Sequence, residues 1–193
     1  MIPACPERHP TLRFVRHGAT AANVLGLRCG GDLDLELVAA GRKQASEVGR
    51  RLAIMDPPVR VIVTSGLRRT LETARIIARA LGCNALIVEP DFAERRLGDW
   101  NLRSIDGTQR WLEQGLTPPG GEANNEFAAR VACAAHRLLT YLPDSPLVVG
   151  SKGVARVLGE LSGRPGRLEL ANATIAEFDL SAPLHPSTAG EIR

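Results

Sequence analysis

The segment LRFVRHGATAAN, residues 12–23, places an arginine, a histidine and a glycine directly after a short apolar run. Residues 12–15 have the composition of a buried strand, and Gly18 with the small residues after it predicts a turn. His17 is then expected just beyond the carboxyl end of the strand. Ligands bind outside this end of the strands in open α/β sheets. His17 and its neighbour Arg16 are therefore the first candidates for a binding or catalytic site.

Short β-rich runs alternate with longer helical patterns in the rest of the chain. Apolar residues recur at three- and four-residue spacing in segments that begin near residue 38, cover residues 71–81 and cover residues 127–139. Strands that alternate with helices indicate an α/β fold, a three-layer α/β/α sandwich with a mostly parallel central sheet. The expected strands are residues 12–15, 59–64, 85–88, 147–149 and 174–178.

The length of 193 residues suits a single domain, which is expected to occupy residues 1–193. A small cap is expected over residues 101–121, and residues 181–193 are expected to form a loose tail. No apolar run approaches the roughly 20 residues that a membrane span needs, so no membrane association is expected. The first ten residues lack the layout of a signal peptide, which favours a cytoplasmic protein.

Charge and cysteine content argue against two further classes. The net charge of +3 comes from dispersed arginines and is accompanied by only 4% aromatic residues, so no nucleic-acid-binding surface is expected. The four cysteines lie far apart without a CxxC spacing, which favours free thiols over a metal site or a disulfide framework. Asp32 and Asp34 look like a metal-binding fragment, but their context, GGDLD, favours a turn.

The RHG triplet is the first of four segments that follow one another in a specific order. They are RHGATAAN at 16–23, SGLRRTLETA at 65–74, FAERRLGDW at 92–100 and PPGGEANNEFAARV at 118–131. This series resembles the histidine phosphatase superfamily, which comprises the cofactor-dependent phosphoglycerate mutases and their phosphatase relatives. The resemblance extends over most of the chain and implies the phosphoglycerate mutase-like version of the α/β/α sandwich.

The resemblance implies a role for each matching residue. His17 is the nucleophile that carries the phosphoryl group as phosphohistidine, while Arg16 and Arg69 hold the phosphoryl oxygens. Physical chemistry agrees, because a neutral imidazole can attack phosphorus and guanidinium groups bind oxyanions in a bidentate, permanently charged manner. Glu94 matches the carboxylate that acts first as general acid and then as general base. Asn23 matches a polar contact to phosphate or substrate.

Alternatives to these roles are structural. Arg69 can form an ion pair or a cap within its own helix, and Glu94 can form an exposed pair with a neighbouring arginine. Arg28 lies in the expected substrate loop, where it either contacts an anionic part of the substrate or has no part in binding. The scheme needs no metal and no cofactor, because the arginines neutralise the charge of the phosphoryl group.

The sequence departs from the family pattern at the second catalytic histidine. The family motif V-V-S-H-G-G-V-I-R corresponds to VVGSKGVAR at residues 148–156, which places Ser151 at the histidine and Lys152 after it. A shift by one residue aligns Lys152 with the histidine but loses three later matches. One preorganised donor to the transferring group contributes about 10²- to 10³-fold in rate. Ser151 can offer a neutral hydrogen bond and Lys152 a positive charge, so both are expected to bind substrate, with reduced activity.

These observations predict a phosphoric monoester hydrolase that acts on a small phosphorylated metabolite. Only residues 101–117 separate the E-x-x-x-G-x-W segment from PPGGE, which leaves little chain to exclude water as a mutase must. A short phosphatase of the broad-specificity or α-ribazole-phosphate type is therefore favoured over a phosphoglycerate mutase. The alternative from another class is a non-catalytic protein that binds a phosphate ligand or inorganic phosphate through Arg16, His17 and Arg69.

Overall fold

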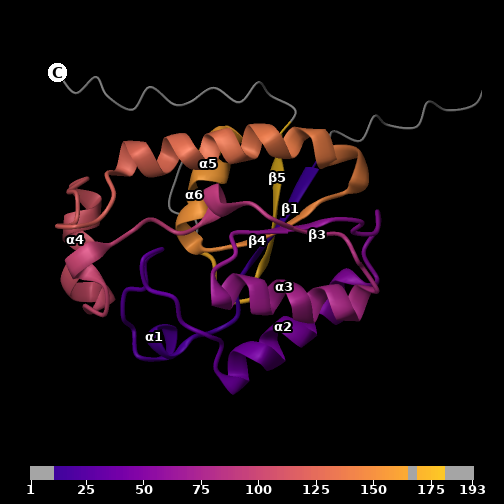
Figure 1. The fold of residues 1–193 in the computed structure, drawn as a ribbon, viewed down its shortest axis with the longest axis horizontal. Coiled ribbons are helices and arrows are strands. Elements are labelled where there is room, and N and C mark those ends of the chain that lie inside the picture. The colour runs from indigo at the N-terminus through magenta and orange to yellow at the C-terminus, as the bar shows by residue number, and fades with distance from the viewer. Residues whose placement is uncertain (1–10, 165–168, 181–193) are drawn as a thin grey trace, which may run out of the picture.

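The computed structural model describes residues 11–164 and 169–180, and the tail expected at 181–193 lies outside them. A five-stranded sheet forms the centre of the protein (Figure 1). Its strands are β1 (Thr11–Arg16), β2 (Ile62–Thr64), β3 (Leu86–Val88), β4 (Leu147–Gly150) and β5 (Ile175–Asp179). Their order across the sheet is β3-β2-β4-β1-β5. Strands β1 to β4 are parallel and β5 is antiparallel to β1, which confirms the mostly parallel sheet.

Helices cover both faces of this sheet, as the alternation of strands and helices predicts. One face is covered by α2 (Ala39–Leu52) and α3 (Arg68–Leu81), and the other by α5 (Asn124–Leu138) and α6 (Lys152–Leu161) (Figure 1). Two smaller helices, α1 (Ala21–Val24) and α4 (Ile105–Glu113), lie to one side of the sheet. Short 3-10 segments are found at Pro90–Phe92, Gly98–Trp100 and Leu139–Asp144.

Two apolar clusters hold the three layers together. One joins Val15 and Val149 of the sheet to Val48 of α2 and Ile77 of α3. Phe14, the neighbour of Val15, packs in the other cluster, with residues of α5 and α6. The side chains of a strand alternate between the two faces of a sheet. Consecutive residues at the end of β1 therefore point toward different helices.

Helix α6 is not among the helical segments that the sequence predicts. Ser151 is the N-cap residue, and the helix begins at Lys152 with no intervening loop. Gly153 and Gly159 weaken the helical signal in the sequence, since glycine is a poor helix former. The helix forms because it buries an apolar face, which includes Val154, against the sheet.

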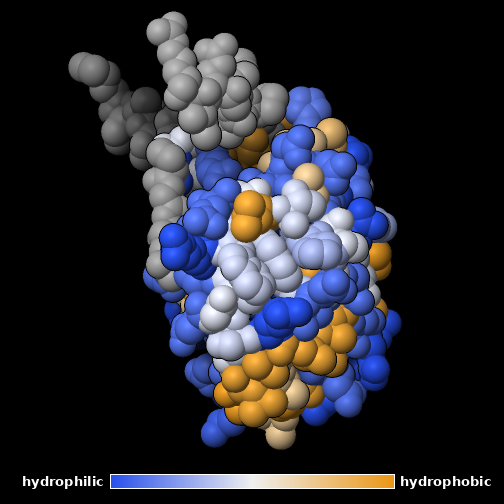
Figure 2. Space-filling view, turned by 90° about the vertical axis from the view of Figure 1, so that its left-hand side faces the viewer, coloured by the Kyte–Doolittle hydropathy of each residue, from blue (hydrophilic) through white to orange (hydrophobic). Residues whose placement is uncertain are grey.

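The segment expected as a cap carries α4 next to the loop that follows α1. Leu27 and Ser104 form an antiparallel bridge between the two. Figure 2 shows this side of the molecule, on which an apolar area lies among polar residues. Leu25 and Ile105 are exposed apolar residues of these two segments. In the described parts of the chain, no helix combines the length and the apolar character that crossing a membrane requires.

Candidate functional site

The end of β1 brings His17 to the carboxyl edge of the sheet. The backbone N–H of His17 donates to the last carbonyl of β4 at 2.9 Å, so the ladder between the two strands continues past β1. Val15 of β1 pairs with Val149 of β4, which pairs with Thr64 of β2. His17 lies two residues after Val15, and Ser151 lies two residues after Val149. Because side chains alternate along a strand, both point to the same face of the sheet as Thr64. This is the face that α3 covers.

The ring of His17 is buried and oriented by a backbone carbonyl. The residue is only 4% exposed, and its Nδ1 lies 2.8 Å from the carbonyl oxygen of Gly18. A carbonyl oxygen can only accept a hydrogen bond, so Nδ1 carries the proton and Nε2 keeps its lone pair. This is the tautomer that a nucleophilic imidazole requires.

The surroundings of His17 hold its pKa well below the ordinary value. Burial is the main cause, because the protein interior solvates an imidazolium poorly. The positive charges of Arg69 and Arg16 lower the pKa further, and the hydrogen bond to Gly18 opposes them only in part. His17 is therefore neutral at physiological pH.

This pKa shift predicts how stability depends on pH. Because the pKa of His17 is lower in the folded chain, the unfolded chain binds a proton that the folded chain does not, once the pH falls below 6.5. The stability is fully present above that pH and decreases below it, by at most about 1.4 kcal/mol per pH unit. Urea unfolding of the wild type and of His17→Asn between pH 7.5 and 5.5 tests this. We expect the wild type to lose more stability over this interval, and an equal loss in both proteins would contradict the prediction.

Four buried side-chain atoms in the described part of the chain lack a hydrogen-bond partner. Unpaired buried groups of this kind are rare in proteins, because each costs about 1–3 kcal/mol. The residues that carry them lie around His17. Arg16 precedes it in β1, and Arg69 belongs to α3, the helix that covers its face of the sheet. Thr64 and Ser151 share that face. They therefore indicate a site for an anion that accepts hydrogen bonds. The atoms are Nε of Arg16, Oγ1 of Thr64, Nε of Arg69 and Oγ of Ser151.

Backbone carbonyls fix the two arginines in place. Arg69 is fully buried, and it donates from Nη1 to the carbonyl of Leu33 at 2.8 Å and from Nη2 to that of Gly30 at 3.1 Å. Arg16 donates from Nη1 to the carbonyl of Leu170 at 2.6 Å. Burial lowers the pKa of Arg16, and the nearby charge of Arg69 adds to this effect. Two preorganised guanidinium groups at one place favour the binding of a multiply charged oxyanion.

Glu94 is held at the amino end of α6, next to Ser151. Its Oε1 accepts a hydrogen bond from the backbone N–H of Arg95 at 2.8 Å, and its Oε2 accepts one from the N–H of Gly153 at 2.9 Å. The negative charge of Glu94 acts to raise the pKa of Arg16, although burial of the guanidinium outweighs it. The carboxylate therefore lies within electrostatic range of Arg16, one of the residues with an unpaired donor atom.

The fourth motif segment, residues 118–131, supplies two residues that fix the backbone of Glu94. Arg130 of α5 donates from Nη2 to the carbonyl of Glu94 at 3.0 Å and from Nη1 to that of Ala93 at 2.8 Å. The buried carboxylate of Glu122 accepts from Nε of Arg130 at 2.7 Å and from Nη2 at 2.9 Å. Although burial opposes the change, hydrogen bonds from Arg130 lower the pKa of Glu122. The PPGGE segment, which contains Glu122, therefore acts on Glu94 through Arg130.

Asn23 is connected to His17 through Asn172, a residue for which the sequence offers no signal. The Nδ2 of Asn172 donates to the carbonyl of His17 at 3.0 Å and to Oδ1 of Asn23 at 3.1 Å. The same Oδ1 accepts from the backbone N–H of Thr20 at 3.0 Å. A contact between Asn23 and a substrate therefore has to come from its Nδ2, and that contact stays a prediction.

Arg28 and Lys152 have protein partners. Arg28 donates from Nε to Oγ1 of Thr108 at 2.8 Å and from Nη2 to Oε1 of Gln109 at 2.9 Å, so it joins the expected substrate loop to α4. The Nζ of Lys152 lies 3.1 Å from a carboxylate oxygen of Glu169, which pairs its charge. Substrate contacts by these two residues also stay predictions.

Thr64 offers a test of the anion site that leaves its charges intact. Because the Thr64 hydroxyl has no partner in the described structure, Thr64→Val is expected to leave the stability of the free protein unchanged or higher. Binding of vanadate is expected to weaken by about 0.5–1.5 kcal/mol, the net contribution of one neutral hydrogen bond. Chemical unfolding and vanadate titration measure the two effects.

Thr70→Val is the matched control. The hydroxyl of Thr70 donates to the carbonyl of Leu67 at 2.9 Å and lies 2.8 Å from Oγ of Ser65. Loss of these bonds is expected to destabilise the free protein without weakening vanadate binding. If Thr70→Val weakens vanadate binding more than Thr64→Val does, Thr64 does not face the anion.

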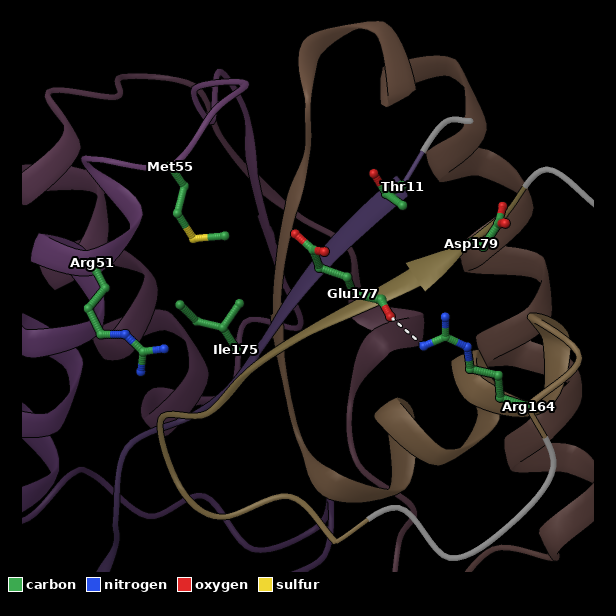
Figure 3. A pocket seen from close by; sticks show the side chains of 7 residues that line it. All are labelled: Thr11, Arg51, Met55, Arg164, Ile175, Glu177 and Asp179. Carbon is green, nitrogen blue, oxygen red and sulfur yellow. Dashed lines mark hydrogen bonds between the residues drawn. The ribbon is translucent and has the colours of Figure 1, made fainter. Parts of the chain in front are cut away.

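The pocket drawn in Figure 3 is separate from His17. It has a volume of about 420 Å³ and extends along β5, where Asp179 pairs with Thr11 at the amino end of β1. None of the predicted site residues lines it. The lining residues are Thr11, Arg51, Met55, Arg164, Ile175, Glu177 and Asp179.

The residues that the structure describes contain no group of three or more side chains suited to bind a metal ion. Asp32 instead accepts hydrogen bonds from the backbone N–H groups of Leu97 at 2.9 Å and Gly98 at 2.7 Å. The candidate site itself combines one neutral imidazole, two guanidinium groups, a hydroxyl at a helix N-terminus and a carboxylate.

Known proteins resemble this chain in sequence over most of its length. The family model of the histidine phosphatase superfamily (branch 1) matches residues 12–182. The chain is 35% identical over 184 residues to a protein of Enterobacter sp. (strain 638) named as a probable phosphoglycerate mutase GpmB, covering 86% of this chain and 83% of the relative. It is 32% identical over 201 residues to the protein of the same name from Photorhabdus laumondii, covering 93% and 92%.

Solved structures with the same fold include named phosphatases. A mycobacterial glucosyl-3-phosphoglycerate phosphatase in complex with VO3 superposes with a TM-score of 0.73 at 28% identity, covering 89% of this chain and 93% of that one. The α-ribazole phosphatase from Shigella flexneri has a TM-score of 0.71 at 24% identity, covering 86% and 89%, and shows the likeness of fold alone.

Proposed function

Because the chain belongs to the histidine phosphatase superfamily, we propose that it hydrolyses small phosphoric monoesters through a phosphohistidine on His17. The observation that carries the proposal is the buried, neutral His17 beside unpaired donor atoms of Arg16, Arg69 and Ser151. A phosphoryl group supplies the acceptors that these donors lack. The free Nε2 supplies the nucleophile.

The first step transfers the phosphoryl group to the protein. Nε2 of His17 attacks phosphorus, the bond from phosphorus to the ester oxygen breaks, and Glu94 gives its proton to the leaving alkoxide. Arg16 and Arg69 bind the equatorial oxygens, where the negative charge of the transition state is spread. Ser151 donates one neutral hydrogen bond at the position where the family has its second histidine.

The second step returns His17 to its starting state. The carboxylate of Glu94 takes a proton from water as the water oxygen attacks phosphorus, and the bond between Nε2 and phosphorus breaks. Inorganic phosphate leaves, and the proton on Glu94 is available for the next cycle. Both steps balance without a metal ion or an organic cofactor.

Hydrolysis fits the cap of this chain better than mutase activity does. A mutase has to keep water away from the phosphohistidine while its substrate turns around. The cap here contains a single short helix, α4, between two loops. We therefore group the chain with the hydrolysing members of the family, although its relatives include proteins named as probable mutases.

The replacement of the second histidine by Ser151 favours one other function, that of a phosphate-binding protein without turnover. Release of p-nitrophenol from p-nitrophenyl phosphate, together with thermal unfolding in the presence of vanadate, distinguishes the two. The hydrolase is expected to release p-nitrophenol and to be inhibited by vanadate. Stabilisation by vanadate without turnover would identify a binding protein. No response to vanadate in either assay would contradict both functions.

A further inference from the structure

We infer that Gly153 is a positioning residue for Glu94, and that the lack of a side chain at this position lets Glu94 protonate the leaving group. This inference rests on the proposed function and deepens it. It concerns the first turn of α6, in which Gly153 is the second residue.

The contact between Gly153 and Glu94 leaves no room for a side chain. A Cβ atom at position 153 would overlap Oε1 of Glu94, and it would lie 2.9 Å from Cδ and 3.0 Å from Oε2 of the same carboxylate. The backbone N–H of Gly153 donates to Oε2 at 2.9 Å. The same residue thus binds the carboxylate and lets it approach the helix.

Further hydrogen bonds also fix Glu94. Its Oε1 accepts from the N–H of Arg95, and its backbone carbonyl accepts from Arg130. A side chain at position 153 therefore cannot be accommodated by a small shift of Glu94 alone, because the carboxylate would lose one or both of its backbone hydrogen bonds. We expect a displaced carboxylate to transfer its proton to the leaving group inefficiently.

A structural role of Gly153 predicts the opposite sign. Alanine forms helices more readily than glycine, and position 153 lies within α6. If the glycine served only the helix, Gly153→Ala would stabilise the protein and leave catalysis unchanged. The two roles are therefore separable by experiment.

The experiment compares two esters that differ in their need for a proton. A p-nitrophenolate leaves without protonation, whereas the alkoxide of glycerol 2-phosphate needs a general acid. For Gly153→Ala we expect kcat/KM for glycerol 2-phosphate to fall by about 10²-fold or more. We expect kcat/KM for p-nitrophenyl phosphate to fall by less than about tenfold. This parameter reports phosphoryl transfer to His17, and that step does not need a general acid when p-nitrophenolate is the leaving group.

Gly159→Ala is the matched control in the same helix. A Cβ at position 159 would meet its nearest neighbours, the carbonyl of Arg164 and the ring of Phe178, at 3.5 and 3.7 Å, which is ordinary contact. We expect this variant to hydrolyse both esters at the wild-type rate. Thermal unfolding of both glycine variants confirms that each is folded under the assay conditions.

Shortening the carboxylate tests the contact directly. In the Glu94→Asp background the carboxylate is withdrawn by one methylene, so adding Gly153→Ala is expected to cost less than about threefold on either ester. Equal losses on both esters, a wild-type rate, or the same loss in the Glu94→Asp background would overturn the positioning role alone. Absence of turnover by the unmodified protein would overturn the proposed function, and this inference with it.

Discussion

Replacing His17 by alanine is expected to abolish the phosphatase activity, with a loss on the order of 10⁴-fold or more in kcat. The reason is that the two-step route through phosphohistidine no longer exists, and no other described histidine lies at the carboxyl edge of the sheet. Turnover of p-nitrophenyl phosphate measures the loss. Acid-labile phosphate on the quenched protein, present in the wild type and absent in the variant, measures the intermediate itself.

The control for this substitution is His136→Ala. His136 lies on α5 and is exposed. We expect wild-type turnover and a wild-type amount of acid-labile phosphate. Labelling that persists in His17→Ala would show that another residue carries the phosphoryl group.

The second large effect is expected for Arg69→Lys, which keeps the positive charge but removes the planar fork. A lysine cannot supply the unpaired Nε donor and also bind the carbonyls of Gly30 and Leu33. We expect kcat/KM to fall by about 10²- to 10³-fold. Because buried carbonyl oxygens lose their donors, the free energy of unfolding is expected to fall by about 1–3 kcal/mol. Steady-state kinetics and urea unfolding measure the two losses.

Arg68→Lys separates the site from a general effect of arginine on this helix. Arg68 precedes Arg69 in α3, is exposed, and pairs with Glu36 at 3.2 Å. Exposed ion pairs contribute little, so we expect a change of less than about twofold in kcat/KM and about 0.5 kcal/mol or less in stability. If both variants lose activity equally, the catalytic role assigned to Arg69 is wrong.

Much of the fold follows from the sequence because its main elements have strong local signals. The apolar runs predict all five strands of the sheet, and the spacing of apolar residues predicts α2, α3 and α5. Helix α6 lacks so clear a signal, since Gly153 lies in its first turn and a glycine there favours a turn instead. The same glycine leaves space for the carboxylate of Glu94, so the helical signal is weak at the point where the proposed site needs room.

The site residues differ in how far a sequence can reveal them. His17, Arg16, Arg69 and Glu94 belong to motifs, and the structure brings them to one end of the sheet. Thr64 gives no such signal, because its place beside the site depends on the register between β2 and β4. Asn172 likewise acts through contacts with residues far away in the chain. Arg130 lies in the fourth motif segment, but its contact with Glu94 forms only in the folded protein. Only packing in three dimensions defines these contacts.

The attachment of α4 has a consequence for how such proteins diverge. This helix of nine residues is joined to the rest of the protein by a hydrogen bond from Arg28 and by the bridge between Leu27 and Ser104. In addition, the ring of Trp111 packs against that of Trp100, with their centroids 5.2 Å apart. The groups proposed to break the bond to phosphorus lie on other elements. Mutations in α4 can therefore accumulate over generations and reshape this small helix, while the proposed catalytic groups are inherited unaltered.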